Sequence, residues 1–388
     1  MSRKKVCVVI TARASYSRFR SALTAINEHS DLDLFLVVSS SALLNKFGSA
    51  AEVIESDGFT IGAKVYNALE SGNNLIGQAK TTGLGIIELS NVFNNEKPDY
   101  VVTIADRYET MATAIAASYM NIPLIHIQGG EVTGNIDEKV RHSITKLADL
   151  HLVSTELAKE RVLKLGEQAD RVCITGCPSI DIADEVNESE SIQKSFDIYK
   201  KYGGVGSSPD YSEGYLVVMQ HSVASEYEQS QQHIEETLQA ISTIGMPTFW
   251  FWPNMDVGTD GISKGIRIER ELNELENIHF FKNMEPVDFL VLLKNSKCIV
   301  GNSSVGIREC SFLGVPTVNI GSRQGGRERG PNVMDVDYVH QEIEEAIYKQ
   351  LEHGPYSTST LYGEGNAGVK IADVIAQIDL TTTKKLSY

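Results

Sequence analysis

Short apolar runs alternate with helix-like segments along almost the whole chain, and this alternation constrains the fold more than any other feature. In the first half the runs cover residues 5–10, 32–39, 99–105, 122–128, 150–154 and 172–176; in the second half they cover residues 215–221, 247–254, 278–283, 297–303 and 316–322. Strands that read as continuous apolar runs and are separated by helices indicate parallel sheets covered on both faces. The sequence therefore predicts an α/β protein with two Rossmann-like, doubly wound halves.

A polar segment, residues 184–214, separates the two halves. It is charged at first and ends rich in Gly and Ser, which is typical of a domain connection. A chain of 388 residues has room for two domains of roughly 150 residues each. We place the N-terminal domain at residues 1–185 and the C-terminal domain at residues 186–365, and we expect residues 366–388 to form a last helix and a tail.

The charge of the chain limits its partners. The 51 Asp and Glu outnumber the 35 Lys and Arg, and the net charge of -16 has the wrong sign for coating nucleic acid or an anionic membrane. An anionic ligand would therefore need a local basic cleft. No stretch reaches 18 consecutive apolar residues, and the basic N-terminus is followed by only a short apolar run, so we expect a cytoplasmic protein.

The five cysteines are odd in number and lie mostly in or beside apolar runs, which predicts reduced thiols in the core. Cys173 and Cys177 lack a partnering His or Cys nearby, so no metal site is predicted.

Residues just after each strand are candidates for contact with a ligand, because ligands of open parallel sheets bind beyond the carboxyl ends of the strands. Arg13, Ser15 and Ser17 follow the first strand, where a dinucleotide enzyme would carry a glycine fingerprint. We therefore predict no nicotinamide or flavin cofactor.

Asp106 and Arg107 follow the strand that ends at residue 105. An alternative for this pair is a helix-capping aspartate and a solvent-facing arginine.

One strand-loop-helix passage, HIQGGEVTGNIDEKVRH, is unusually rich in chemistry-bearing residues. It holds His126, Gln128, Gly129, Gly130, Glu131, Asp137, Glu138, Arg141 and His142. The simple alternative is a turn capped by Asp137, with Arg141 in an i,i+4 ion pair. Two glycines directly after a buried strand let the backbone approach a ligand, however, and carboxylates beside Arg and His favour a functional site.

The second half carries polar residues at its own strand ends. His221 and Asn254 each follow a strand, although a lone His is more often structural. Asn302, Ser303 and Ser304 open a helix, and N–H groups, hydroxyls and the helix dipole together predict a phosphate site, with simple Ser capping as the alternative. Glu309, on the same predicted helix, could bind the two hydroxyls of a ribose. Arg323, Arg327 and Arg329 lie in a glycine-rich loop that would supply local positive charge.

Phosphate and ribose together imply a nucleotide. The chain has no GxxxxGK[ST] loop, which argues against ATP hydrolysis of the P-loop type.

These passages, in this order, resemble the hydrolysing UDP-N-acetylglucosamine 2-epimerases, the enzymes that open sialic acid synthesis. The resemblance covers nearly the whole chain and rests on TARASYS, ADRYE, HIQGGEVTGNIDEKVRHSITKLA, His221, PNMD, GNSSVGIRE and GSRQGGRERG. It implies the GT-B fold, in which two Rossmann-like domains face each other across a cleft and the C-terminal helix crosses back to the first domain. It also implies a homodimer or homotetramer.

The resemblance completes the set of candidate site residues. The candidates for catalysis are Asp106, Glu131, Asp137 and His221. The candidates for contact with a UDP-sugar are Arg13, Ser17, Arg107, Gln128, Arg141, His142, Asn254, Asn302, Ser303, Ser304, Glu309 and Arg323.

The chain departs from the family pattern at two positions. Ala105 stands where a glycine is usual, and Gln128 stands where several relatives have Glu. A glutamine cannot transfer a proton at ordinary pH, so Glu131 or Asp137 would do that work here, or the substrate differs slightly.

The implied reaction converts UDP-N-acetylglucosamine and water to N-acetylmannosamine and UDP. It proceeds by anti-elimination of UDP to 2-acetamidoglucal, followed by hydration, and needs no cofactor. Similar enzymes act on UDP-N,N'-diacetylbacillosamine, in the legionaminic acid pathway, and the motifs do not separate the two substrates. The remaining alternatives are a GT-B glycosyltransferase, which would need an acceptor, a non-hydrolysing epimerase, which would return UDP-N-acetylmannosamine, and a nucleotide-sugar binder without activity.

Overall fold

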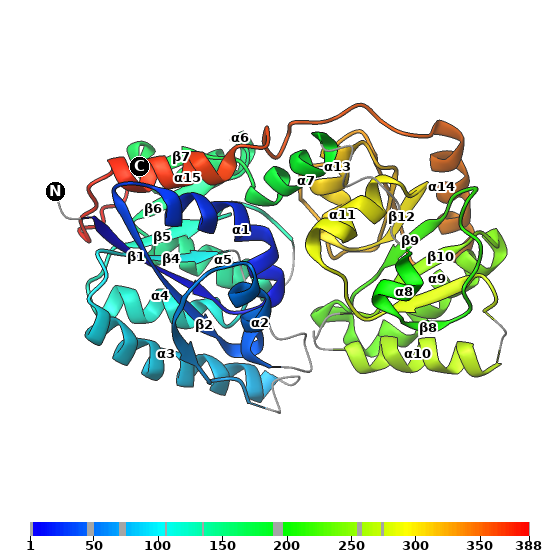
Figure 1. Ribbon diagram of the computed structural model, residues 1–388, viewed down its shortest axis with the longest axis horizontal. Coiled ribbons are helices and arrows are strands. Elements are labelled where there is room, and N and C mark those ends of the chain that lie inside the picture. The colour runs from blue at the N-terminus through cyan, green and yellow to red at the C-terminus, as the bar shows by residue number, and fades with distance from the viewer. Residues whose placement is uncertain are drawn as a thin grey trace. The chain divides into compact units, whose positions relative to one another are not determined.

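The computed structural model describes residues 3–44, 50–69, 75–104, 107–133, 136–188, 197–253, 258–272 and 275–387. The chain divides into two compact units (Figure 1). Unit 1 comprises residues 1–131, 137–181 and 362–388, and unit 2 comprises residues 132–136 and 182–361. The predicted boundaries at 185 and 366 lie near the divisions after residue 181 and before residue 362.

Unit 1 is built on a parallel sheet that, within the described residues, has seven strands in the order β3-β2-β1-β4-β5-β6-β7. The strands are β1 (Lys4–Ile10), β2 (Leu32–Ser39), β3 (Ile61–Val65), β4 (Tyr100–Ile104), β5 (Leu124–Ile127), β6 (Leu150–Val153) and β7 (Val172–Ile174). Six of them confirm the predicted strands of the first half. The order reverses between β1 and β4, so this is the switch point of a doubly wound sheet.

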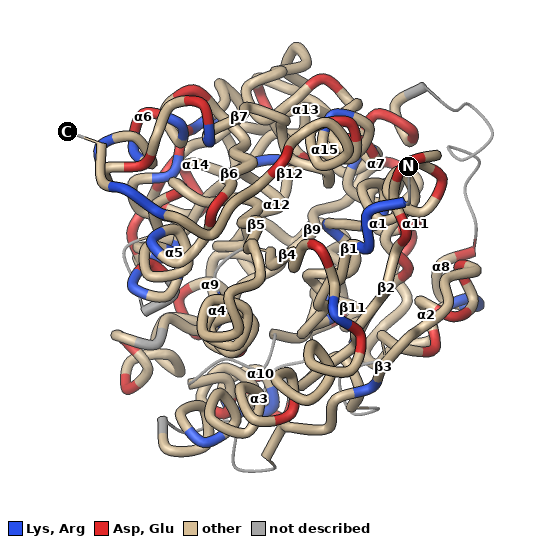
Figure 2. Tube along the Cα trace, turned by 90° about the vertical axis from the view of Figure 1, so that its left-hand side faces the viewer, with Lys and Arg blue, Asp and Glu red and all other residues tan. Residues whose placement is uncertain are grey.

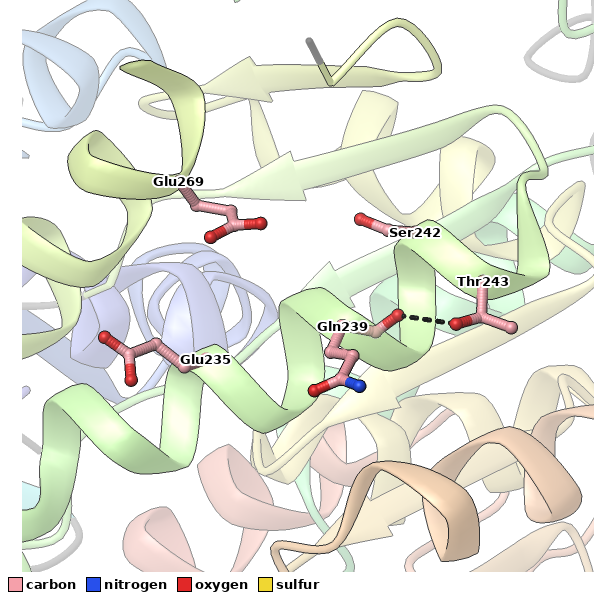
Figure 3. A pocket seen from close by; sticks show the side chains of 5 residues that line it. All are labelled: Glu235, Gln239, Ser242, Thr243 and Glu269. Carbon is pink, nitrogen blue, oxygen red and sulfur yellow. Dashed lines mark hydrogen bonds between the residues drawn. The ribbon is translucent and has the colours of Figure 1, made fainter. Parts of the chain in front are cut away.

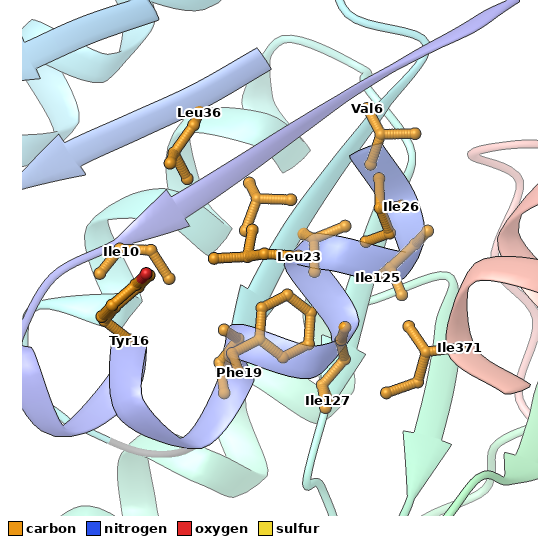
Figure 4. Packing of buried hydrophobic residues seen from close by; sticks show 14 of the residues in the cluster. Val6, Ile10, Tyr16, Phe19, Leu23, Ile26, Leu36, Ile125, Ile127 and Ile371 are labelled. Carbon is orange, nitrogen blue, oxygen red and sulfur yellow. The ribbon is translucent and has the colours of Figure 1, made fainter. Parts of the chain in front are cut away.

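Helices cover both faces of this sheet, as the alternation along β1 shows. Val6, Val8 and Ile10 pack in one apolar cluster, whereas Cys7 and Val9 pack in another. The first cluster includes side chains of α1 (Arg13–Glu28) and α15 (Ala367–Gln377), such as Phe19 and Ile371 (Figure 4). The second includes side chains of α3 (Leu75–Glu96), α4 (Thr110–Tyr119) and α5 (Ile136–Leu147).

The C-terminal helix α15 is fixed at both ends within unit 1. The carboxylate of Asp181 accepts hydrogen bonds from the backbone N–H groups of Ala367, at 2.9 Å, and Gly368, at 2.7 Å, which cap its first turn. A Cβ atom on Gly368 would lie 2.7 Å from the backbone of Ser21 in α1, so the glycine permits the close approach of the two helices. At the other end, the Lys4 ammonium donates to the Ala376 carbonyl at 3.0 Å.

Unit 2 has the same doubly wound plan. Its sheet, counted over the described residues, has the order β14-β13-β12-β9-β10-β11-β8, in which only β8 is antiparallel to its neighbour. The strands are β8 (Val205–Gly206), β9 (Leu216–Met219), β10 (Thr248–Phe251), β11 (Ile278–Phe281), β12 (Cys298–Gly301), β13 (Thr317–Ile320) and β14 (Val333–Val336). All five predicted strands of the second half are confirmed, and the order reverses between β9 and β12.

The two faces of the unit 2 sheet are packed differently. One face buries Ile234, Leu238 and Ile241 of α9 (Ser230–Ile244), which confirms the predicted apolar face of this helix, together with residues of α10 (Thr259–Leu272) and α14 (His340–His353). The other face carries an aromatic cluster in which Phe251 contacts Phe289 of α11 (Pro286–Lys294) at a ring separation of 5.0 Å.

The remaining α-helices among the described residues are α2 (Ala50–Ser56), α6 (Glu156–Lys164), α7 (Pro178–Glu188), α8 (Ile198–Tyr202), α12 (Ser304–Ile307) and α13 (Glu309–Leu313). Two short elements, α8 and β8, lie within residues 184–214, the predicted domain connection. Residues 189–196 of that segment lie outside the described residues.

Charged residues lie mostly on helices, loops and strand ends, and the strand interiors are largely uncharged (Figure 2). All five cysteines are free thiols, as predicted, and burial raises the pKa of the Cys7 thiol to about 12. Within the part of the chain that the structure describes, no helix combines the length and apolar character needed to cross a membrane.

Candidate functional site

The switch point of the unit 2 sheet joins two predicted site residues. His221 follows β9 and Asn302 follows β12, and the two strands are neighbours in the sheet. The His221 backbone N–H donates to Asn302 Oδ1 at 2.7 Å, and Asn302 Nδ2 donates back to the His221 carbonyl at 2.8 Å. Both residues are buried. A side chain from one strand end thus fixes the backbone of the other, and this places the imidazole of His221 at the carboxyl edge of the sheet.

The glycine-rich loop after β13 is attached to the same point. Arg323 Nη1 donates to the Asn302 carbonyl at 3.2 Å, and Gln324 Nε2 donates to the same oxygen at 2.9 Å. Gly301, the last residue of β12, permits the close approach of this strand to the end of β9, since its φ is +133° and a Cβ atom would lie 2.2 Å from the Met219 carbonyl. The loop therefore places a guanidinium, that of Arg323, at the switch point.

The predicted phosphate loop has a shorter helix than expected. Ser303 is the N-cap of α12, and its Oγ accepts from the Val305 N–H at 3.4 Å. Ser304 Oγ accepts from Arg308 Nη2 at 3.0 Å. Because α12 spans only four residues, it has little more than its first-turn N–H groups and the nearby guanidinium to offer an anion.

Glu309 corrects the sequence prediction in one respect. It does not lie on the helix that Ser304 opens but begins α13, after a break at Arg308. Its side chain is buried, and its Oε2 lies 3.9 Å from Nε of Arg308, which is itself buried. A buried carboxylate next to a buried guanidinium therefore begins the helix that follows the serines.

In unit 1, the segment after β4 contains an ion pair with a buried carboxylate. Arg107 Nε donates to Glu109 Oε1 at 2.7 Å, and the Glu109 side chain is fully buried. The alternative of a solvent-facing arginine is therefore wrong, because the side chain of Arg107 is only 25% exposed and is held by Glu109. Glu109 thus orients a guanidinium at the carboxyl edge of this sheet.

The segment after β5 contributes to a buried polar group of unit 1. Glu131 and Arg141 are 5% and 1% exposed, and Arg141 Nη1 donates to the Glu131 carbonyl at 2.7 Å. Ser154, which follows β6, donates from Oγ to Glu131 Oε1 at 3.4 Å. Gln128 has a φ of +65° and donates from Nε2 to Cys177 Sγ at 2.9 Å. Arg141 is thus a buried residue that helps to fix the Glu131 backbone.

Three other predicted residues lie on helices α1 and α5 of unit 1. Arg13 begins α1, and Ser17 Oγ donates to its carbonyl at 3.1 Å. The His142 Nε2 atom lies 3.2 Å from Glu138 Oε1, one turn earlier on α5. Asp106, Asn254 and the side chain of Asp137 lie outside the described residues.

Several polar residues at these edges were not singled out by sequence reasoning. Ser154, Cys177 and Gln324 each contact a predicted residue. The sequence signal that these residues carry is their position a few residues after the end of a strand.

A hollow of about 530 Å³ lies elsewhere, on α9 and α10 of unit 2 (Figure 3). It is lined by Glu235, Gln239, Ser242, Thr243 and Glu269, none of which is a predicted site residue. Among the residues that the structure describes, no group of three or more His, Cys, Asp or Glu is arranged to hold a metal ion.

The sequence is similar to known proteins over most of its length. A family model described as UDP-N-acetylglucosamine 2-epimerase matches residues 24–376. A Legionella pneumophila protein named UDP-N,N'-diacetylbacillosamine 2-epimerase (hydrolyzing) is 30% identical over 377 residues, covering 97% of this chain and 97% of that protein. Polysialic acid biosynthesis protein P7 of Escherichia coli is 34% identical over 336 residues, covering 86% of this chain and 82% of that protein.

A solved structure supports the fold. The UDP-GlcNAc 2-epimerase from Neisseria meningitidis, bound to UDP-GlcNAc, superposes with a TM-score of 0.78 at 18% identity, covering 96% of this chain and 100% of that chain. This likeness confirms the predicted fold class of two Rossmann-like, parallel-sheet domains of the GT-B kind. With a family model that spans most of the sequence and relatives similar over most of its length, the chain belongs to the UDP-N-acetylglucosamine 2-epimerase family.

Proposed function

We propose that the chain is a hydrolysing epimerase that converts UDP-N-acetylglucosamine and water to N-acetylmannosamine and UDP. The observation that carries this proposal is the linked group His221, Asn302 and Arg323 at the switch point of unit 2, where doubly wound sheets bind their ligands. A guanidinium and an imidazole held there by backbone contacts suit the diphosphate of a leaving UDP. Donors placed in advance of the reaction are worth on the order of 3 kcal/mol each in the transition state.

The chemistry proposed for unit 1 is proton transfer. In the first step a base removes the hydrogen from C2, the C1–O bond breaks, and UDP leaves with the bonding electron pair, giving 2-acetamidoglucal. The protonated base then releases this proton to solvent. In the second step a carboxylic acid on the opposite face gives a proton to C2, water adds its oxygen to C1, and the carboxylate left by that acid takes up one proton of the water. Each positioned acid or base contributes about 10²- to 10⁴-fold. We propose Asp106, Glu131 and Asp137 for these roles.

Similarity to named relatives supports a second substrate. The Legionella protein is named for UDP-N,N'-diacetylbacillosamine and aligns with nearly the whole chain. This sugar carries a second acetamido group, and the same two steps at C1 and C2 apply to it. We therefore keep it as the alternative substrate.

Product analysis tests the proposal. The purified chain is incubated separately with UDP-N-acetylglucosamine and UDP-N,N'-diacetylbacillosamine in D₂O, without an acceptor, and the products are identified by mass spectrometry and NMR. We expect free UDP and a free 2-epimerised amino sugar with one deuterium at C2 from one of the two. Recovery of UDP-N-acetylmannosamine would show a non-hydrolysing epimerase, and a requirement for an acceptor would show a transferase.

A further inference from the structure

Gln128 has an unusual backbone at the end of a central strand. Its φ of +65° is in the left-handed region, which a residue with a side chain seldom occupies and which favours glycine. Its N–H donates to the Leu152 carbonyl at 3.0 Å, so the conformation is fixed by the neighbouring strand β6. Backbone strain of this kind costs about 1–3 kcal/mol and is concentrated at functional sites.

The Gln128 side chain is held by a buried thiol. Its Nε2 donates to Cys177 Sγ at 2.9 Å, and the same sulfur lies 3.0 Å from Ser179 Oγ. The three side chains are 2%, 0% and 4% exposed, respectively. Cys177 is itself fixed, because its backbone N–H donates to the Tyr362 carbonyl at 2.7 Å. When the thiol donates to Ser179, the sulfur offers its lone pairs to the amide, and Nε2 must face Cys177.

The other end of the amide has a different environment. Gln128 Oε1 is buried, and among the residues that the structure describes no donor lies within hydrogen-bond distance of it. A buried acceptor without a donor costs about 1–3 kcal/mol. This oxygen lies at the carboxyl edge of the unit 1 sheet, in the segment that also holds Glu131. A ligand donor at this edge would remove the penalty.

We propose that Cys177 is a positioning residue that acts through Gln128. Its thiol orients the amide so that Gln128 Oε1 accepts a hydrogen bond from a hydroxyl or amide N–H of the sugar. This inference rests on the proposed function. Because an amide transfers no proton at ordinary pH, Gln128 orients the sugar, and the proton transfers belong to the carboxylates.

Two cysteine variants and a matched control test the proposal. Cys177→Ala removes the sulfur, Cys177→Ser keeps a polar atom of similar size, and Cys173→Ala removes a half-buried thiol of β7 in the same unit. We expect Cys177→Ala to lower kcat/KM for the UDP-sugar about 10-fold, the effect of one hydrogen bond. The affinity for UDP alone should change less than about 2-fold, and Cys177→Ser should recover most of the loss. Equal activity of all three variants and the parent would overturn the proposal.

A double-mutant cycle separates positioning from general destabilisation. If Cys177 acts only through Gln128, then Cys177→Ala should have no further effect on kcat/KM in a Gln128→Ala background. Independent effects that multiply would mean that the cysteine acts by another route and would refute the inference. Because Cys177→Ser retains the volume, the Ser variant can be carried through the same cycle if the Ala variant folds poorly.

Infrared spectroscopy tests the link without activity. The S–H stretch lies in a region free of other protein bands, and the difference spectrum between the parent and Cys177→Ser isolates the Cys177 band. We expect Gln128→Ala to shift this band, whereas Cys173→Ala should leave it unchanged. A shifted band in a chain that turns over no UDP-sugar would mean that the contact is present and the proposed function has failed. An unshifted band in an active enzyme would refute the contact.

Discussion

A buried carboxylate, that of Glu167, holds the C-terminal tail on the rest of unit 1, and its removal gives the sharpest stability prediction. Glu167 is 4% exposed, and its two oxygens accept from Lys146 at 2.6 Å, Lys384 at 2.7 Å and His151 at 3.0 Å. Lys384 also donates to the carbonyls of Thr145 and Ala148 at the end of α5. One carboxylate thus holds together α5, β6 and a tail residue more than 200 positions away.

The magnitude follows from the pKa of Glu167. Burial by itself would raise this pKa, but hydrogen bonds from His151, Lys146 and Lys384 together outweigh burial and lower it from 4.5 to about 2. Since each tenfold change in proton affinity equals about 1.4 kcal/mol, the ionised carboxylate stabilises unit 1 by about 3 kcal/mol at neutral pH. Glu167→Gln should remove most of this amount and leave two ammonium groups short of a partner.

The pH dependence has a definite sign. The unfolded chain binds a proton at Glu167 near pH 4.5, whereas the folded chain does so only near pH 2. The contribution is therefore fully present above about pH 5.5 and is lost as the pH falls toward 2. Glu167→Gln should be less stable at neutral pH and should lose less stability on acidification than the parent.

The assay must report on unit 1 alone. Both tryptophans, Trp250 and Trp252, lie in unit 2, so their fluorescence follows the wrong unit. Hydrogen exchange measured by mass spectrometry on peptides from α5 and β6 gives the free energy of opening directly. The control is Glu160→Gln, whose side chain is 61% exposed and lies 4.0 Å from Lys164. It should cost less than about 0.5 kcal/mol. A loss below about 1 kcal/mol for Glu167→Gln, or parallel pH profiles, would refute the reasoning.

Four further variants test the two sheet edges and the last helix. Asn302→Ala removes both bonds to His221 and should weaken UDP binding at least about 10-fold by calorimetry; unchanged affinity would discard the switch point as the nucleotide site. Arg323→Ala should also weaken UDP binding about 10-fold or more, through loss of a charged donor, and a normal dissociation constant would remove its role. Glu131→Gln should keep UDP affinity but lower turnover at least about 10²-fold, and near-normal turnover would exclude it as an acid or base. Asp181→Asn weakens the cap of α15 and should cost about 1 kcal/mol in hydrogen exchange of that helix, with no change counting against the capping role.

The strands and the fold class were predictable because they depend on local pattern. Strands buried on both faces read as apolar runs, and this signal identified β1, β9 and the strands beside them in the interior of each sheet. It failed for β3, β8 and β14, which lie at or next to the ends of the two sheets. Their burial is partial or low: β3 has an alternating pattern, and both residues of β8 are exposed. Their sequences therefore do not differ from those of loops.

The polar strand ends were equally visible in the sequence, but their partners were not. The sequence alone placed His221, Asn302, Arg323 and Glu131 at carboxyl ends of strands, since that requires only the strand positions. Only the tertiary structure joined His221 to Asn302 across 81 positions, Gln128 to Cys177 across 49 and Glu167 to Lys384. Such contacts are decided by strand order and by the packing of helices on the sheets, because sequence periodicity specifies which face of an element is buried but not which element lies against it.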